Sequence, residues 1–373
     1  MNARGLAIGA VALALLTVLA APAASAPSSR PGAVILDSGS GRVLARVPAD
    51  DVITSAVPDG RGGWYVGGYF GRIGGEPRRA LAHLLPSGVV DPGWRVAVTS
   101  VRGNRVHVGA LARSGSRLYV AGGFGFVGGL HRPGLASIDL RTRRVLEPFK
   151  PGAWIDVQRL AVTGEHLLVA RQSNYPVPGI SALDLRTGEP DRDWNPRLKL
   201  IGDAGGFHAL VVRGPRVYVA GSFRVAGLPR NGLAALDVRT GAPDPVWAPR
   251  PPDCPVCRRF AALYDLAASR ERVYVSGFFS RFEGVPRKGV VALDPGTGAV
   301  DRRWRPGRGG QAIVALALAG ARLYLGRTSA LGPTVGLSAL DPETGAAVRA
   351  PKVPFGHVIL LTRSGRNLLV AGR

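Results

Sequence analysis

Three of the six histidines and one aspartate stand at comparable points of the chain, each at or near the start of an apolar, β-rich run: His107, His208, His357 and Asp156. Imidazole and carboxylate groups can together hold a divalent metal or transfer protons, so their convergence would form a candidate site. Side chains at such positions also face neighbouring strands, where histidines find hydrogen-bond partners. The second interpretation is favoured, and no metal or cofactor is expected.

Four arginines recur at one position of a glycine- and proline-rich link: Arg78, Arg132, Arg230 and Arg287. If these links lie on one face, their guanidinium groups could bind carboxylate or phosphate groups. Alternatively, each arginine pairs with an acidic or carbonyl group of the next repeat. The formal charge of +23 would attract anions at long range. A GC-rich genome that encodes arginine wherever a cation is tolerated explains the same charge.

Five aspartates precede a turn at one recurring position: Asp139, Asp184, Asp237, Asp294 and Asp341. An aspartate there is predicted to accept hydrogen bonds from turn amides. A reaction needs its catalytic residue once, so fivefold recurrence indicates a structural role. The aromatic residues near the end of each unit are predicted to pack between repeats; they are Trp94, Phe149, Trp194, Trp247 and Trp304.

The elements that must position these residues follow from an internal repeat. Its clearest copies are Arg117–Phe124, Arg216–Phe223, Arg272–Phe279 and Trp64–Phe70. Equivalent strand residues recur about every fifty positions, the length of a four-stranded propeller blade. They are Tyr65, Tyr119, Leu168, Tyr218, Tyr274, Tyr324 and Leu369. No segment has sustained helical periodicity.

The two ends of the chain complete the pattern. Residues 33–47 match only the second half of the unit, whereas residues 356–373 match only the first half. A composite blade built from both ends would hide exposed strand edges. The sequence therefore predicts an all-β, seven-bladed β-propeller with four-stranded blades over residues 27–373. The expected blades are 52–96, 105–151, 156–197, 206–250, 260–306, 311–351, and 33–47 with 356–373.

Residues 1–26 carry one charge, Arg4, followed by an apolar run and small residues, the pattern of a secretory signal peptide. No other stretch is apolar and long enough to span a membrane. Cys254 and Cys257 are the two cysteines of the chain. In an oxidising compartment, a local disulfide between them is the favoured interpretation, because a second ligand pair for zinc and a thioredoxin-like βαβ pattern are both missing.

The repeat copies resemble the delta-60 repeat, a bacterial β-propeller repeat of uncharacterised function, over roughly residues 33–373. Two copies depart from its glycine-phenylalanine link, at Arg171–Tyr175 and at Gly326–Ser329. The A-L-D-x-x-T-G run at Ala182–Gly188 is also similar to repeats of quinone-dependent dehydrogenase propellers. The first resemblance implies a propeller fold. The second implies an enzyme, although the Cys-Cys pair associated with several of those enzymes is absent.

We therefore predict an exported binding or scaffold module without catalytic activity. Its expected partner is an anionic cell-envelope polymer or another exported protein. Nucleic acid is not an expected partner, because the chain is exported and poor in lysine. The alternative is an extracytoplasmic enzyme, quinone-dependent or metal-assisted, with its site at the mouth of the central channel.

Overall fold

The computed structural model describes residues 30–100, 103, 105–154, 156–172, 179–201, 206–228, 231–250, 262–307, 312–328 and 336–373. The secondary structure of these residues is entirely β, which confirms the all-β part of the predicted fold class. Within the same ranges there is no helix that could cross a bilayer. The predicted signal peptide, Arg230 and both cysteines lie outside the described residues, so those predictions stay predictions.

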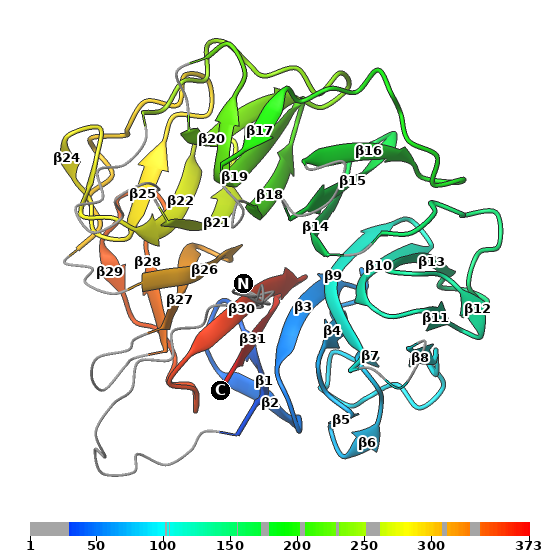
Figure 1. Ribbon diagram of the computed structural model, residues 1–373. Helices are drawn as coiled ribbons and strands as arrows, with labels where there is room; N and C mark the ends of the chain where they lie inside the picture. Colours follow the sequence, from blue (N-terminus) through cyan, green and yellow to red (C-terminus); the bar gives the residue numbers. More distant parts are fainter. Residues whose placement is uncertain are drawn as a thin grey trace, which may run out of the picture.

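The principal sheets follow one another around a central axis, as expected for a propeller (Figure 1). We call six of them blades 1 to 6 in chain order. Blade 1 contains β3 (Ile53–Pro58), β4 (Trp64–Gly68) and β7 (Leu81–Leu84); blade 2 contains β9 (His107–Ser114), β10 (Arg117–Gly123) and β13 (Leu135–Asp139); blade 3 contains β14 (Val157–Val162), β15 (His166–Arg171) and β16 (Ile180–Asp184). Blade 4 contains β18 (Phe207–Arg213), β19 (Arg216–Val225) and β20 (Asn231–Asp237), with β17 (Leu198–Leu200) on the far end of β19; blade 5 contains β21 (Ala262–Ala268), β22 (Val273–Phe278) and β25 (Val290–Leu293); blade 6 contains β26 (Ala312–Ala319), β27 (Arg322–Thr328), β28 (Leu337–Leu340) and β29 (Ala347–Val348).

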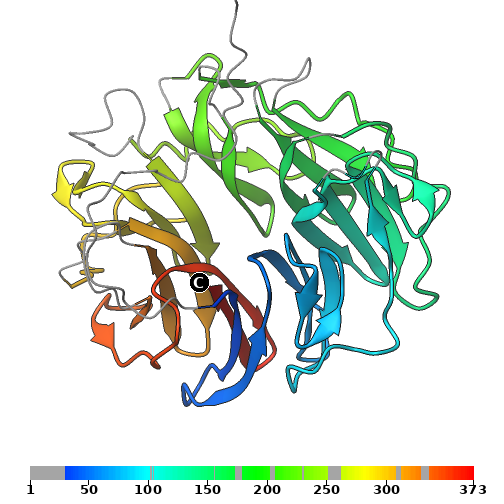
Figure 2. The same cartoon turned by 60° about the horizontal axis from the view of Figure 1, so that its bottom comes forward.

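The remaining principal sheet joins the two ends of the described chain, and we call it the composite blade. Its strand order is β2 (Val43–Pro48), β1 (Gly32–Asp37), β31 (Asn367–Gly372) and β30 (Val358–Ser364). Strand β1 pairs antiparallel with β31 along its whole length, from Gly32 opposite Gly372 to Asp37 opposite Asn367. The earliest and latest strands accordingly lie side by side in both ring views (Figures 1 and 2). The first described strand thus belongs to the same sheet as the last two strands, β30 and β31.

Short hairpins leave the outer part of three blades between the second and third strands. They pair β5 (Arg72–Ile73) with β6 (Glu76–Pro77), β11 (Phe126–Val127) with β12 (Leu130–His131), and β23 (Arg281–Phe282) with β24 (Val285–Pro286); β8 (Val98–Thr99) pairs with β11. They occur in blades 1, 2 and 5, where the sequence has the complete glycine-rich link. Blades 3 and 6, whose sequences depart from this link, show no such hairpin among their described residues.

The expectation of four strands in every blade is not confirmed. In blades 1 to 5 the outermost segment makes only an isolated bridge to the third strand, for example Leu236 to Pro243 in blade 4. In four of these blades an aspartate follows this bridge and accepts bonds from the next backbone amides, as Asp301 does from Arg303 (2.9 Å) and Trp304 (3.2 Å). The chain therefore turns away from the ladder and buries its tryptophan between blades.

The hydrophobic core consists of separate clusters, each shared by two successive blades. Middle strands are buried on both faces, which explains their continuous apolar runs. One cluster joins Ile35 of the composite blade to Trp64 of blade 1, and another joins Leu36 to Tyr324 of blade 6. The composite blade is therefore packed on both sides, like the blades that are continuous in sequence.

Candidate functional site

Each described innermost strand contains a β-bulge near its start. Each bulge adds one residue opposite the second strand, so the pairing register shifts at the same place in every blade. A bulge twists the strand and redirects the side chains beside it. The extra residues are Thr54, Gly109, Gln158, His208, Tyr264, Val314 and Ile359.

The predicted histidines do not share one position relative to these bulges. His107 and Asp156 precede the bulge residue of their strands by two positions, and His357 does the same in the composite blade. His208 is itself the bulge residue of blade 4. The described residues contain no group of three histidine, cysteine, aspartate or glutamate side chains able to hold a metal ion.

Each of the three histidines instead has its own neighbour. The His107 ring stacks on Tyr69, with centroids 4.6 Å apart. His208 Nδ1 lies 2.6 Å from the Leu263 carbonyl oxygen, so this nitrogen carries the proton and donates. His357 Nδ1 lies 2.8 Å from Thr328 Oγ1. Burial lowers the pKa of the His107 and His208 imidazoles, so the neutral form of each ring is favoured.

The innermost strand β21 also carries a carboxyl group that the sequence did not single out. Asp265 follows the bulge of blade 5 and accepts hydrogen bonds from the amides of Leu266 (2.8 Å) and, in blade 6, Leu316 (2.7 Å). Burial raises the pKa of this carboxyl to about 6. Asp265 therefore joins two blades and also titrates in the weakly acidic range.

The three predicted link arginines that the structure describes are bonded inside their own repeats. Arg287 is 7% exposed and donates to the carbonyl oxygens of Pro286 (2.9 Å), Asp301 (3.2 Å) and Trp304 (2.9 Å). Arg78 is buried in the same way against Pro77 and Asp91. Arg132 is half-buried and donates to His131 and Glu147. Each of the three also donates to a carbonyl on the outer segment of the same blade, so these side chains fasten the link to that segment, and a role in ligand binding stays a prediction.

The turn aspartates take the structural role that the sequence indicated. In each of the five predicted cases the Oδ1 atom accepts bonds from two turn amides; Asp237, for instance, accepts from Arg239 and Thr240, both at 2.9 Å. In all five a threonine hydroxyl three residues on also donates to this oxygen within 3.2 Å. The aromatic residues at the ends of the units are likewise buried in the clusters between blades.

Sequence analysis missed a hydrogen bond that recurs between blades. The tyrosine of the second strand donates to the carbonyl just after the turn aspartate of the next blade. Tyr119 reaches Leu185 (2.7 Å), and Tyr324 reaches Ser38 (3.2 Å) across the chain ends. Tyr218 to Pro295 and Tyr274 to Pro342 are the other pairs. The R-x-Y spacing was visible in the sequence, but its acceptors lie 66 or more residues away.

The exposed cations are elsewhere, and blade 5 carries a dense group of them. Arg302, Arg303 and Arg305 follow Asp301 on its outer segment, and we call these three the blade 5 arginines. All three are exposed, and no hydrogen bond or ion pair of their side chains occurs within the described ranges. In the sequence these arginines stand in the D-R-R-W-R run at 301–305, but the alignment of the repeats did not single them out.

The electrostatic surroundings of Arg287 show that this group is crowded with positive charge. Burial lowers the pKa of the Arg287 guanidinium, and Arg305 and Arg302 lower it further by repulsion, whereas Asp301 raises it. Asp301 itself is engaged by the Arg272 side chain at 2.9 Å. A 350 Å³ hollow is lined by Arg302 and Arg303 together with Glu271, Asp294 and Asp301. Counted with Arg272 and Arg305, four arginines exceed these three carboxylates by one, so this edge keeps a positive charge that attracts anions.

Comparisons with known proteins agree on the fold and indicate no specific function. A family model described as a β-propeller domain of unknown function (DUF5122) matches residues 58–93. Among solved structures, a computationally designed protein, Ika8, has a TM-score of 0.54 at 15% identity, covering 92% of this chain and 88% of that one. The WD40 β-propeller domain of Doa1 has a TM-score of 0.52 at 10% identity, covering 92% and 97%. The chain is thus a β-propeller of a kind for which no activity is indicated.

A third similar structure is the extracellular domain of a hybrid two-component system, BT4673, from B. thetaiotaomicron. Its TM-score is 0.56 at 13% identity, with 92% of this chain matching 39% of that one. No curated protein matches the sequence. At these identities the likeness concerns architecture alone.

Proposed function

We propose that this chain is an exported seven-bladed propeller that binds an anionic envelope polymer through the blade 5 arginines and has no catalytic activity of its own. Export is supported by the signal-like segment at residues 1–26. A ring of seven is supported by the seven apolar clusters, each of which joins successive blades. The delta-60 repeat is the repeat type that the copies support.

The observation that carries the binding proposal is the unequal use of acidic and basic side chains. Most described carboxylates are engaged within the fold, in turns or in pairs such as Asp244 with Arg216 (2.6 Å) and Asp301 with Arg272. The blade 5 arginines are exposed and have no such acceptors in the described chain. Because the fold does not use these cations, they are available to a partner.

Arginine suits phosphate and carboxylate partners because its planar guanidinium can donate two parallel hydrogen bonds to them. Three such groups within four residues can contact successive charges of a flexible polymer. A polymer also gains from simultaneous contacts, because each contact after the first forms within the same complex. The expected partner is therefore a repeating polyanion rather than a single small ion.

Binding should be measured with two defined probes, long-chain polyphosphate and poly-L-glutamate, on the full chain at low and moderate salt. We expect the triple variant R302Q/R303Q/R305Q to bind at least about tenfold more weakly and with a shallower salt dependence. The matched control is R141Q/R144Q/R186Q, which removes the same charge from exposed turns of blades 2 and 3. Its binding should change by less than about threefold.

Equal weakening in both triple variants would show that binding follows total charge and would contradict a site on blade 5. Absence of binding to either probe at low salt would overturn the polymer proposal and favour an exported protein as the partner. Thermal unfolding of each variant tests whether it remains folded. Since the substituted side chains are exposed, we expect midpoints close to that of the unmodified protein.

A further inference from the structure

Blade 6 lacks an aromatic side chain that other blades place at the junction with the preceding blade. In blades 1, 2, 4 and 5 the second strand leads to Phe70, Phe124, Phe223 and Phe279. All four are buried and belong to the clusters between blades. In blade 6 the residue at the phenylalanine position of the sequence is Ser329, and the described part of the cluster between blades 5 and 6 contains no phenylalanine.

A cavity of about 510 Å³ lies at this junction. Its apolar wall includes Val290 of blade 5 and Ile313, Leu325 and Leu340 of blade 6. Cavities of this size commonly accommodate small organic ligands. The repeat thus explains the space: the pocket occurs where the link phenylalanine is missing.

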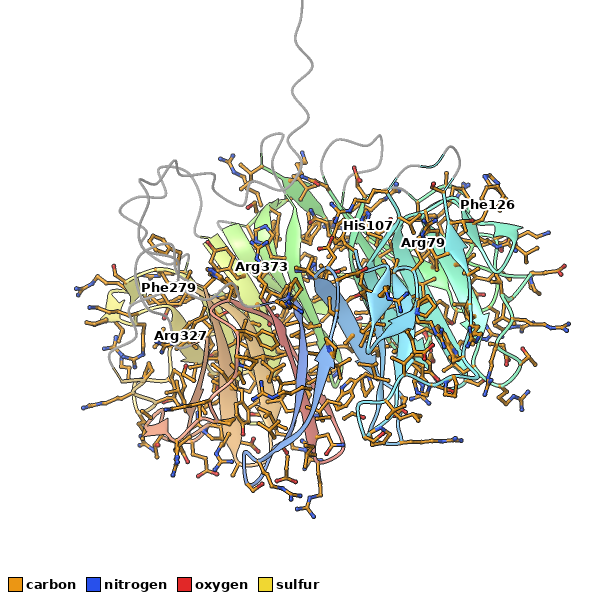
Figure 3. All side chains as sticks on the ribbon, turned by 90° about the horizontal axis from the view of Figure 1, so that it is seen from below. Arg79, His107, Phe126, Phe279, Arg327 and Arg373 are labelled. Carbon is orange, nitrogen blue, oxygen red and sulfur yellow. The ribbon has the colours of Figure 1, made fainter. Side chains whose placement is uncertain are left out.

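Arg327 lines this cavity and replaces a glycine of the repeat. In other blades that glycine is required because a Cβ would approach an innermost-strand carbonyl too closely, at 2.2 Å in Gly122 and 2.3 Å in Gly372. Arg327 is half-buried, and its Nε is enclosed without an acceptor. Figure 3 shows Arg327 on the ribbon of blade 6. An enclosed guanidinium N–H without an acceptor is costly, so the Nε of Arg327 favours an anionic partner.

Blade 3 provides the comparison. Arg171 occupies the same repeat position as Arg327, but its guanidinium lies 4.1 Å from the ring centroid of Trp154. Trp154 is buried in the cluster between blades 2 and 3 and fills the junction there. Burial lowers the pKa of the Arg327 guanidinium, and no aromatic ring of the described chain covers it. Blades 3 and 6 therefore carry an arginine at the same repeat position, but tryptophan fills the junction beside blade 3, whereas a cavity lies at the junction beside blade 6.

Two further polar groups complete the pocket. Ser338 lines it, and its Oγ is enclosed without a hydrogen-bond partner. Lys352 lines it as well and is exposed. The described lining contains no carboxylate. An acceptor-rich head group would therefore meet two cations and a hydroxyl, and an aromatic body would meet an aliphatic wall.

We infer that this junction is a binding site for a small aromatic carboxylic acid, whose carboxylate pairs with Arg327 and whose ring occupies the place of the missing link phenylalanine. The site is separate from the blade 5 arginines, so neither proposal depends on the other. The missing phenylalanine is the reason to expect an aromatic ring in the ligand. The enclosed Nε of Arg327, which has no acceptor, is the reason to expect an acid.

The test is calorimetric titration of the full chain with 3-phenylpropanoate and with its uncharged amide. We expect saturable binding of the acid, and binding of the amide at least about tenfold weaker, since the amide cannot form the charged pair with Arg327. Arg327→Gln should weaken binding of the acid by at least about tenfold and leave the weak binding of the amide unchanged. Arg349→Gln changes an exposed arginine outside the lining and should alter neither.

A second variant keeps the arginine and fills the space. Val348→Phe introduces a ring from the pocket wall and should abolish binding of the acid while the protein stays folded. This variant decides the matter if Arg327→Gln fails to fold. No saturable binding of the acid, equal binding of acid and amide, or unchanged binding in Val348→Phe would each overturn the inference.

Discussion

The N-terminal strand should contribute as much to stability as the equivalent strand of a blade that is continuous in sequence. Leu36 is fully buried in β1, between the composite blade and blade 6. It precedes Asp37 as Leu236 precedes Asp237 in blade 4, and Leu236 is also fully buried. The test compares Leu36→Ala with Leu236→Ala.

Truncation of a fully buried leucine to alanine costs about 2–5 kcal/mol, through lost apolar burial and the cavity left behind. Unfolding entropy is about 2.1 cal/mol/K per residue, so a folded chain of this length loses roughly 1.4 °C of midpoint per kcal/mol. Both variants should therefore melt about 3–7 °C below the unmodified protein. Leu36 pairs with Val43 on β2 and with Leu368 on β31, and the second partner is more than 300 residues away, so this loss reports on ring closure.

Thermal unfolding followed by circular dichroism and by calorimetry measures both midpoints under one set of conditions. A single cooperative transition, lowered equally in the two variants, supports a ring that unfolds as one unit. If Leu36→Ala melts with the unmodified protein while Leu236→Ala melts lower, β1 does not stabilise the ring and the composite blade is wrong. A separate early transition in Leu36→Ala would show that the composite blade unfolds independently.

Three further changes test the contacts described above. Arg287→Gln removes donors from three carbonyl oxygens and should lower stability by about 3 kcal/mol in thermal unfolding, whereas binding of polyanions should persist; weakened binding at an unchanged midpoint would assign this side chain to the ligand. Tyr274→Phe removes the 2.6 Å bond to Pro342 and should cost about 1 kcal/mol; in the unmodified protein, burial raises the pKa of this phenol to about 12, so its ultraviolet titration should remain incomplete at pH 11. The Asp265 carboxyl has a pKa of about 6, above its ordinary value, so the native state binds more protons than the unfolded state between about pH 4 and 6, and stability should fall by up to about 3 kcal/mol as pH rises through this range. Asp265→Asn should flatten this dependence in urea unfolding at several pH values, and an unchanged slope would assign it to another group.

The parts of the fold that follow from local pattern could be predicted from the sequence. Middle strands are continuous apolar runs because both faces are covered, and Asp237 and its equivalents stand where turn amides need an acceptor. The matching half-repeats at the two ends similarly predicted the sheet in which β1 pairs with β31. These features depend on neighbouring residues or on repetition, and both are visible in one dimension.

The candidate site depended on relationships that the sequence does not show. His208 differs from His107 by two positions relative to the bulges, and a bulge has no reliable sequence signal, so the histidines only seemed equivalent. Arg287 was predicted either to face a ligand or to pair with the next blade. It bonds within its own repeat because the outer segment leaves the ladder at Asp301 and presents free carbonyl oxygens.

The departures from the repeat therefore deserve more weight than the repeat itself in assigning function. A residue present at the same position in several blades, such as Arg78 or Asp139, meets a requirement that those blades share, and its contacts prove to be internal. Arg302, Arg303 and Arg305 have no counterpart as a set in the other blades, and Arg327 occupies a glycine position without the aromatic partner that Arg171 has. Since the described residues give these four guanidinium groups no hydrogen bond or ion pair, a binding partner is the physical reason that best accounts for them. The blade 5 arginines lie on blade 5 and Arg327 lies on blade 6, so the binding measurements should begin with these two neighbouring blades.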